Sequence, residues 1–141
     1  MHMILLHVGS IVLTFLFVLY ADEQGLRYLR GKQKTLSMER VRALHRIVAA
    51  GLSVIIFTGA LMVYQDPSFY FAQATYWVKM CFVLVLVVNA CVIGYLSRFA
   101  VRTPFQELAK REQWMLLASG GVSAFSWVVT ILLGLSLSGW W

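Results

Sequence analysis

The stretch WVKMCFVLVLVVNACVIGYL, from Trp77 to Leu96, decides the fold because almost every residue in it is apolar. Its only charged residue is Lys79, near its beginning. A helix of this length crosses the hydrocarbon core of a bilayer, which takes roughly 20 residues. Three more runs have the same character, Met3–Tyr20, Ile47–Tyr64 and Met115–Leu137. The sequence therefore predicts four transmembrane helices.

The composition of the whole chain supports a membrane protein. Of its 141 residues, 60% are hydrophobic and 13% charged, and the mean hydropathy is +0.76. A soluble domain this small could not bury so much apolar surface. The sequence contains no nucleotide-binding loop, zinc-ligand spacing or Gly-x-Ser-x-Gly motif, which argues against a hydrolytic enzyme. We expect one all-α domain over residues 1–141, an antiparallel four-helix bundle whose main contact is the lipid bilayer rather than nucleic acid.

The basic residues indicate how the helices are oriented. Eleven of the twelve Lys and Arg residues lie in the connections after the first and third spans or at the span ends beside them, and residues 65–76 contain none. The positive-inside rule places those connections in the cytoplasm, so both termini face outward. Aromatic residues are expected to gather at the outer interface: Tyr64, Tyr70, Phe71, Tyr76, Trp77, Trp140 and Trp141. We interpret the chain as a multi-pass protein of the bacterial cytoplasmic (inner) membrane.

Small residues recur along the fourth span and predict how the helices pack. Helices in lipid associate through close contact at small residues and through hydrogen bonds between helices. The stripe consists of Ser119, Ser123, Ser126, Thr130, Gly134 and Ser138. Gly51, Ser53, Thr58 and Gly59 provide similar positions in the second span. We expect these residues to face the other helices, although the stripe could instead dock a partner subunit or a second copy of the chain.

A few polar side chains lie inside the spans, where an ionisable group is costly unless it has a partner or a function. His7 and Lys79 are expected at similar shallow depth in the outer leaflet, so they could meet inside the bundle. Ser10 and Thr14 share a helix face with His7, and Asn89 lies near the middle of the membrane, where it should bond to another helix. His45 lies at the opposite side of the membrane, which argues against a haem held by two histidines of one chain.

A second set of residues with soft ligand atoms shares the outer side. Thioether and imidazole groups together suit copper(I). The members are His2, Met3, His7, Met62 and Met80. The alternative interpretation is that these methionines fill gaps in an apolar bundle.

Three short motifs resemble a group of small bacterial four-helix membrane proteins. They are Leu6-His7-Val8 in the first span, Arg46-Ile47-Val48 with Gly59-Ala60-Leu61 in the second, and Tyr76-Trp77-Val78-Lys79-Met80 in the third. The group includes the HemJ-type protoporphyrinogen oxidases and the copper-resistance D (CopD) membrane domain. His7 resembles a first-helix histidine of the HemJ-type proteins that is implicated in haem or porphyrin handling. Lys79 resembles the lysine that follows tryptophan in the third helix of those proteins.

This resemblance leads to the functional expectation. The leading hypothesis is a redox-associated membrane protein that binds haem b or another porphyrin near the outer leaflet and meets a membrane redox partner. The ligand-binding residues would be His7, Lys79, Ser10, Thr14 and Asn89. Copper(I) handling and a structural role in a membrane complex are the alternatives. Catalytic residues are not identifiable, and the sequence leaves open whether the protein is an enzyme.

Overall fold

The computed structural model describes residues 2–137 and is built from helices throughout that range. The elements are α1 (His2–Leu29), α2 (Met38–Gln65), α3 (Pro67–Phe71), α4 (Ala74–Arg102), the 3₁₀ turn η1 (Phe105–Glu107) and α5 (Lys110–Leu137). The four long helices are long and apolar enough to cross a membrane, which confirms the all-α four-helix prediction. Each is longer than the apolar run that predicted it, because polar residues extend the helix beyond that run.

Local chemistry explains where the helices end. Gly31, with a φ of 70°, makes the turn after α1, a backbone conformation that glycine adopts without steric cost. After α2, the Asp66 carboxylate accepts hydrogen bonds from the Phe69 amide (3.1 Å) and the Ser68 hydroxyl (2.9 Å). Pro67 then occupies the first position of α3, where a missing N–H costs nothing. These residues make the connection between the second and third long helices short and rigid.

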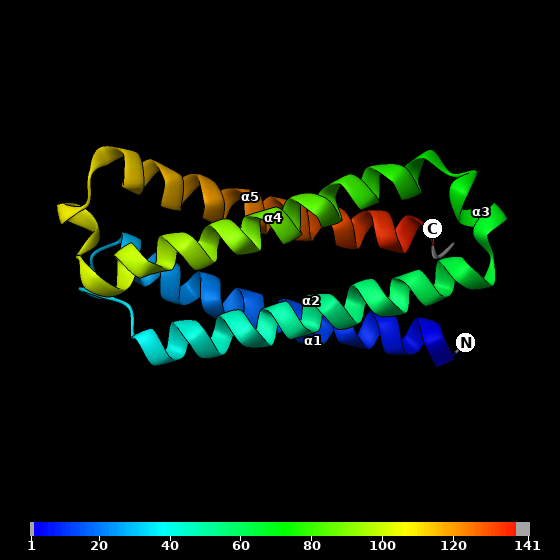
Figure 1. The fold of residues 1–141 in the computed structure, drawn as a ribbon, viewed down its shortest axis with the longest axis horizontal. Coiled ribbons are helices and arrows are strands. Elements are labelled where there is room, and N and C mark those ends of the chain that lie inside the picture. The colour runs from blue at the N-terminus through cyan, green and yellow to red at the C-terminus, as the bar shows by residue number, and fades with distance from the viewer. Residues whose placement is uncertain (1, 138–141) are drawn as a thin grey trace.

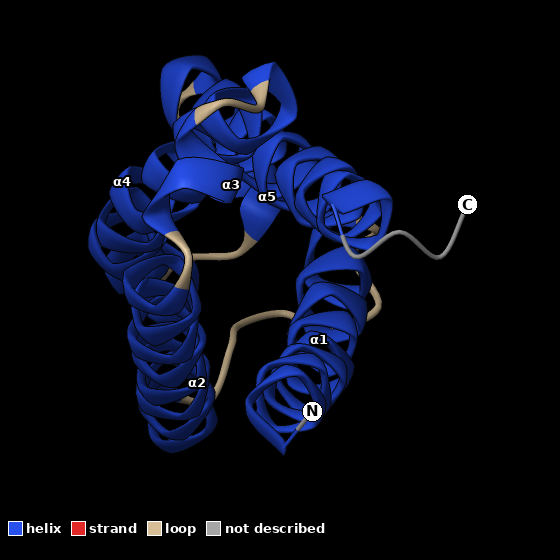
Figure 2. Ribbon diagram, turned by 90° about the vertical axis from the view of Figure 1, so that its right-hand side faces the viewer, coloured by secondary structure: helices blue, strands red, loops and turns tan. Residues whose placement is uncertain are grey.

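The long helices form two antiparallel hairpins (Figures 1 and 2). The first hairpin is α1 with α2 and the second is α4 with α5; each pair packs closely, whereas contacts between the hairpins are sparse. In Figure 2, α2 lies beneath α4 and α1 beneath α5. The bundle is therefore better described as two tight pairs than as four equivalent helices.

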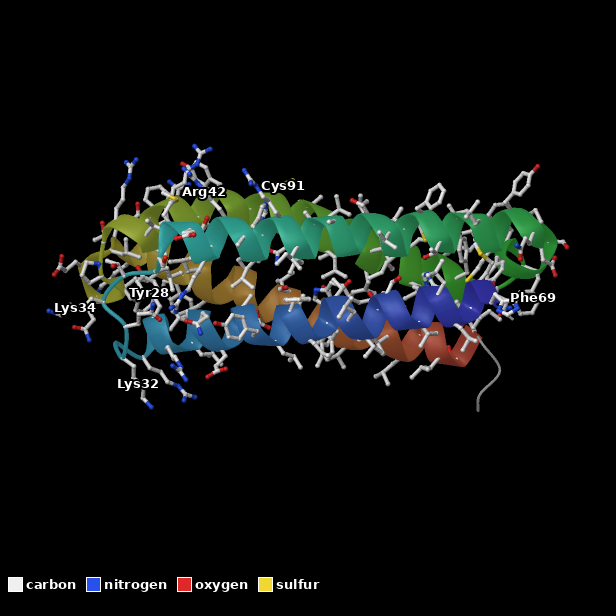
Figure 3. The ribbon with its side chains drawn as sticks, turned by 90° about the horizontal axis from the view of Figure 1, so that it is seen from below. Tyr28, Lys32, Lys34, Arg42, Phe69 and Cys91 are labelled. Atoms are coloured by element: carbon white, nitrogen blue, oxygen red, sulfur yellow. The ribbon has the colours of Figure 1, made fainter. Side chains whose placement is uncertain are left out.

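The two ends of the bundle differ in composition. The basic end carries the connections at residues 30–37 and 103–109, and Figure 3 shows Lys32, Lys34 and Arg42 there. The aromatic end carries α3, the beginning of α1 and the end of α5 (Figure 1). At the aromatic end, the rings of Tyr70, Phe71, Tyr76 and Trp77 contact one another. The expected gathering of these four rings is present, whereas Trp140 and Trp141 lie outside the described residues.

Two apolar clusters fill the interior. The central cluster consists of Val18, Leu52, Ile55, Leu86 and Trp127, with the Phe15 ring 6.1 Å from that of Trp127. The basic-end cluster consists of Tyr28, Ala100 and Leu108. Two hydrogen bonds close the basic end: the Tyr28 hydroxyl donates to the Thr103 carbonyl (2.7 Å), and the Leu36 amide donates to the Ala100 carbonyl (3.0 Å). They tie the first hairpin to the second.

The small residues lie where the sequence places them. On α5, Ser119, Ser123, Ser126 and Thr130 are buried against the chain's own helices. Thr14 packs so closely against Gly51 that a Cβ at Gly51 would overlap the threonine hydroxyl. Ser53 is an exception, because it is exposed and its hydroxyl donates to the Ala49 carbonyl of its own helix. Ser138, the last member of the predicted stripe, lies outside the described residues.

Candidate functional site in the aromatic half

His7 and Lys79 both point into the bundle, each against a glycine of the next helix. The Cε1 atom of His7 lies 3.3 Å from the position that a Cβ at Gly59 would occupy. The Nζ atom of Lys79 lies 3.2 Å from the corresponding position at Gly134. Glycine is what allows these polar groups to approach the neighbouring helix. The Lys79 ammonium therefore packs against α5 rather than extending away from the bundle.

The His7 imidazole is held by one buried hydrogen bond. Its Nδ1 atom lies 2.7 Å from the hydroxyl oxygen of Thr58 on α2. That hydroxyl has a single hydrogen, and its oxygen lies 2.8 Å and 3.1 Å from the carbonyl oxygens of Val54 and Ile55. Because Thr58 donates to these carbonyls, as threonines in helices commonly do, it accepts from the Nδ1–H of His7. With Nδ1 as the donor, the neutral ring would carry its lone pair on Nε2.

The Lys79 ammonium brings positive charge into the same region. Lys79 on α4 and His7 on α1 lie toward the same end of the bundle. Within residues 2–137, Glu23–Arg27 is the one side-chain ion pair, and Lys79 makes neither an ion pair nor a hydrogen bond. An ammonium group out of bulk water is stable only beside a compensating anion or dipoles. The described part of the chain offers Lys79 no such anion.

Thr130 adds a third polar group to this half of the bundle. Its side chain is 8% exposed, and its hydroxyl oxygen is the one buried side-chain oxygen or nitrogen of residues 2–137 without a hydrogen-bond partner. It lies one helical turn from Gly134, against which the Lys79 ammonium packs. Buried hydroxyl groups are normally hydrogen-bonded. The Thr130 hydroxyl thus lacks a partner among residues 2–137 and lies one turn from the glycine against which Lys79 packs.

The other predicted ligand-binding residues make bonds within the protein. The hydroxyls of Ser10 and Thr14 donate to the carbonyls of Leu6 (2.8 Å) and Ser10 (2.7 Å) in their own helix. Asn89 bonds to another helix, as predicted, because its Nδ2 donates to the Ser119 carbonyl (3.0 Å) and its Oδ1 accepts from the Ser119 hydroxyl (2.9 Å). Of the five predicted residues, His7 and Lys79 are the two whose functional atoms remain available.

The predicted copper residues do not all face the same way. His2 and Met80 are exposed on the bundle surface. Met3 precedes His7 by one helical turn and Met62 follows Thr58 by one turn, so these two methionines share the faces on which His7 and Thr58 meet. Within residues 2–137, no cluster of three or more His, Cys, Asp or Glu side chains could hold a metal ion. A copper site would therefore depend on thioethers.

His45 lies far from this site. Its Cε1 atom lies 3.2 Å from the position of a Cβ at Gly94, so it packs between α2 and α4. It is thirteen residues from Thr58, the partner of His7, which is about 20 Å along the helix. His7 and His45 cannot ligate one iron atom, in agreement with the sequence argument.

Sequence reasoning treated Thr58 and Thr130 as packing residues and missed their relation to the site. The signal for Thr58 is its position beside Gly59, since a threonine next to a glycine can accept a hydrogen bond from a closely approaching helix. Nothing in the sequence distinguishes Thr130 from the hydroxyl residues around it. Searches found no matching family model, curated protein or solved structure. Functional inference therefore rests on the geometry and on the resemblance of short motifs.

Proposed function

We propose that this chain is a redox-associated integral membrane protein that binds haem or a related porphyrin in its aromatic half. The observation that carries the proposal is that His7 and Lys79 both point into the bundle at its aromatic end, and that Lys79 has no ion pair among the described residues. Haem has an iron atom for an imidazole nitrogen and carboxylates for an ammonium group. The proposed site therefore matches two different parts of one ligand.

The residues of the chain have separate tasks in this proposal. Nε2 of His7 would hold the iron, and Thr58 would orient the ring through Nδ1, as second-shell partners of ligating histidines usually do. Lys79 would bind a carboxylate, and Thr130 could donate to the same carboxylate or to the ring edge. Haem supplies one-electron chemistry when bound, and the surrounding protein tunes it through ligation, burial and hydrogen bonds.

The resemblance to HemJ-type proteins supports the same two residues. His7 and Lys79 occupy the positions of that group's first-helix histidine and third-helix lysine. The chain lacks the basic residue that those proteins carry toward the end of the first helix, and it also lacks their Asn-Glu-x-Pro run. We therefore propose porphyrin binding and leave the oxidation of protoporphyrinogen out of the proposal.

Haem content of the purified protein tests this function. After expression with added haem, the protein should show a Soret band, and His7→Ala should remove it. His2→Ala and His45→Ala are matched controls, because one side chain is exposed at the helix start and the other lies about 20 Å away. A colourless wild-type protein, or an unchanged Soret band in His7→Ala, would reject the proposal.

Copper(I) binding is a second candidate, favoured by the placement of Met3 and Met62 one turn beyond His7 and Thr58. Copper measured in protein purified after copper loading should fall in His7→Ala and in a Met3→Leu, Met62→Leu double variant. Met80→Ala should leave it unchanged, because Met80 is exposed. Equal copper content in all variants would remove this candidate.

A structural role through the fourth span has less support from the geometry. The small residues of α5 are buried against the chain's own helices, so a partner or second copy would have to use another face.

We further propose that the basic end faces the cytoplasm of a bacterial cell, as the charge distribution favours. Reporter fusions after Leu137 should then indicate an external C-terminal end.

A further inference from the structure

A large cavity lies in the basic half, far from His7 and Lys79. Its volume is about 460 Å³, within the range of roughly 300–1,000 Å³ found for small-molecule sites. All four long helices contribute to its wall. The deep part is apolar and includes Val48, Leu52, Leu86, Ile93 and Trp127. The cavity exists because the two hairpins contact each other sparsely between the central cluster and the basic-end cluster.

A second cavity of about 520 Å³ adjoins the first at the basic end. Both are lined by Gln24, Leu26, Gln33 and Arg40, so the two cavities adjoin at these residues. The second cavity is also lined by Arg27, Arg30, Lys32 and Glu23. Glu23 is already bonded to Arg27 at 2.7 Å, which leaves Arg30, Lys32 and Arg40 to attract an anion. The composite cavity thus has an apolar interior and a strongly basic mouth.

We propose that this composite cavity binds one anionic phospholipid. Its acyl chain would lie between the two hairpins, and its phosphate would contact Arg30, Lys32 and Arg40 at the mouth. From Arg40 to Leu52 the cavity follows α2 for twelve residues, about 18 Å of helix. This depth suits a chain that enters from the membrane surface, and basic pockets between transmembrane helices are known to hold anionic headgroups.

Two polar side chains lie between the mouth and the apolar interior. His45 is five residues further along α2 than Arg40, about 7 Å deeper, and Asp22 lies on the facing wall of α1. At that depth a diacyl phospholipid carries its glycerol backbone and ester groups, whose oxygens accept hydrogen bonds. A free phosphate ion would match the basic mouth but would leave the apolar cavity below it unfilled. The position of the basic cavity directly beside the apolar one is what favours a lipid.

Native mass spectrometry of the full-length protein in detergent can measure this binding directly. The probes are phosphatidylglycerol and phosphatidylcholine with identical acyl chains, titrated separately. We expect phosphatidylglycerol to bind at least tenfold more tightly. Neutralising Arg30 and Arg40 together (Arg30→Gln, Arg40→Gln) should weaken it about twentyfold or more, since each basic residue near a headgroup contributes about fivefold. Arg98→Gln is the control, because Arg98 is exposed on α4 and lines neither cavity.

A second pair of variants tests the apolar part of the cavity. Gly25 and Gly120 line opposite walls, and a Cβ at either position would meet no atom within 4 Å. Gly25→Leu with Gly120→Leu should therefore fill the cavity without strain and lower phosphatidylglycerol affinity at least tenfold. Gly9→Leu is the control, since Gly9 has equally open space and lies outside the cavity.

The headgroup and the acyl chain are tested by different outcomes. Equal affinity for the two lipids, or unchanged binding after neutralisation of Arg30 and Arg40, would overturn recognition of the headgroup. Unchanged binding in the cavity-filling variant would overturn the placement of the chain. His7→Ala should keep full lipid binding, so failure of the haem proposal and failure of this one are distinguishable.

Discussion

The helices pack closely in one half of this bundle and loosely in the other. In the aromatic half, polar groups approach glycines of neighbouring helices, as His7 does at Gly59 and Lys79 at Gly134. In the basic half, the hairpins separate and leave a cavity with apolar walls. Close packing at glycine thus brings unpaired polar atoms together in one half, and loose packing creates space in the other. Each half consequently suits a different class of ligand.

The central cluster joins the halves, so the largest loss of stability is expected there. Trp127 is 3% exposed and contacts Phe15 of α1. Trp127→Ala should lower the free energy of unfolding by about 3 kcal/mol, because the lost van der Waals contacts leave a void. Unfolding in mixed micelles of dodecyl maltoside and dodecyl sulfate, followed by circular dichroism, measures the change.

Trp114→Ala is the matched control for this variant. Trp114 is 71% exposed at the start of α5 and should cost little when truncated. Similar losses for the two tryptophan variants would mean that the central cluster does not hold the hairpins together.

A glycine in each half of the first hairpin tests the difference in packing. Leucine at Gly59 must displace the His7 ring, and such overpacking costs about 1–3 kcal/mol. Leucine at Gly25 enters open space and improves helix propensity, so Gly25→Leu should lose no stability and could gain about 0.5–1 kcal/mol. The same unfolding assay compares them. Equal stability of the two variants would contradict the difference in packing between the halves.

The smallest effect is expected at the bond between Asn89 and Ser119, on the border of the two halves. Asn89→Ala should cost about 0.6–1.7 kcal/mol, which runs from the average to the largest value measured for hydrogen bonds between membrane helices. Ser97→Ala is the control, because its hydroxyl returns to the Gly94 carbonyl of its own helix. A larger loss in Ser97→Ala than in Asn89→Ala would contradict this assignment.

Much of this architecture could be predicted from the sequence because lipid imposes simple rules. Hydropathy gave four spans, and the spacing of serines on the last span predicted its buried face correctly. The placement of His7 and Lys79 toward the same end of the bundle followed from counting residues along each helix. Asn89 could be assigned a partner helix in general terms because an amide in hydrocarbon needs one.

The remaining features depend on how the helices are rotated and on the distances between them. The spacing of residue types along the sequence determines neither. The choice of Thr58 as the partner of His7 requires knowing which faces of α1 and α2 meet. The orphaned hydroxyl of Thr130 becomes visible only once its neighbours have been placed. The cavity in the basic half arises from the gap between hairpins, and sequence patterns describe individual helices rather than the distance between pairs.

The central claim is that His7 and Lys79 bind two parts of one ligand. Haem and its dimethyl ester, which lacks free carboxylates, can be titrated into the purified apoprotein and followed by absorbance. The wild-type protein should prefer free-acid haem at least tenfold, since a hydrogen bond to a charged group contributes about 1.5–3 kcal/mol. Lys79→Gln should remove that preference and keep the histidine-ligated spectrum. A preference for free-acid haem that persists in Lys79→Gln would contradict the account.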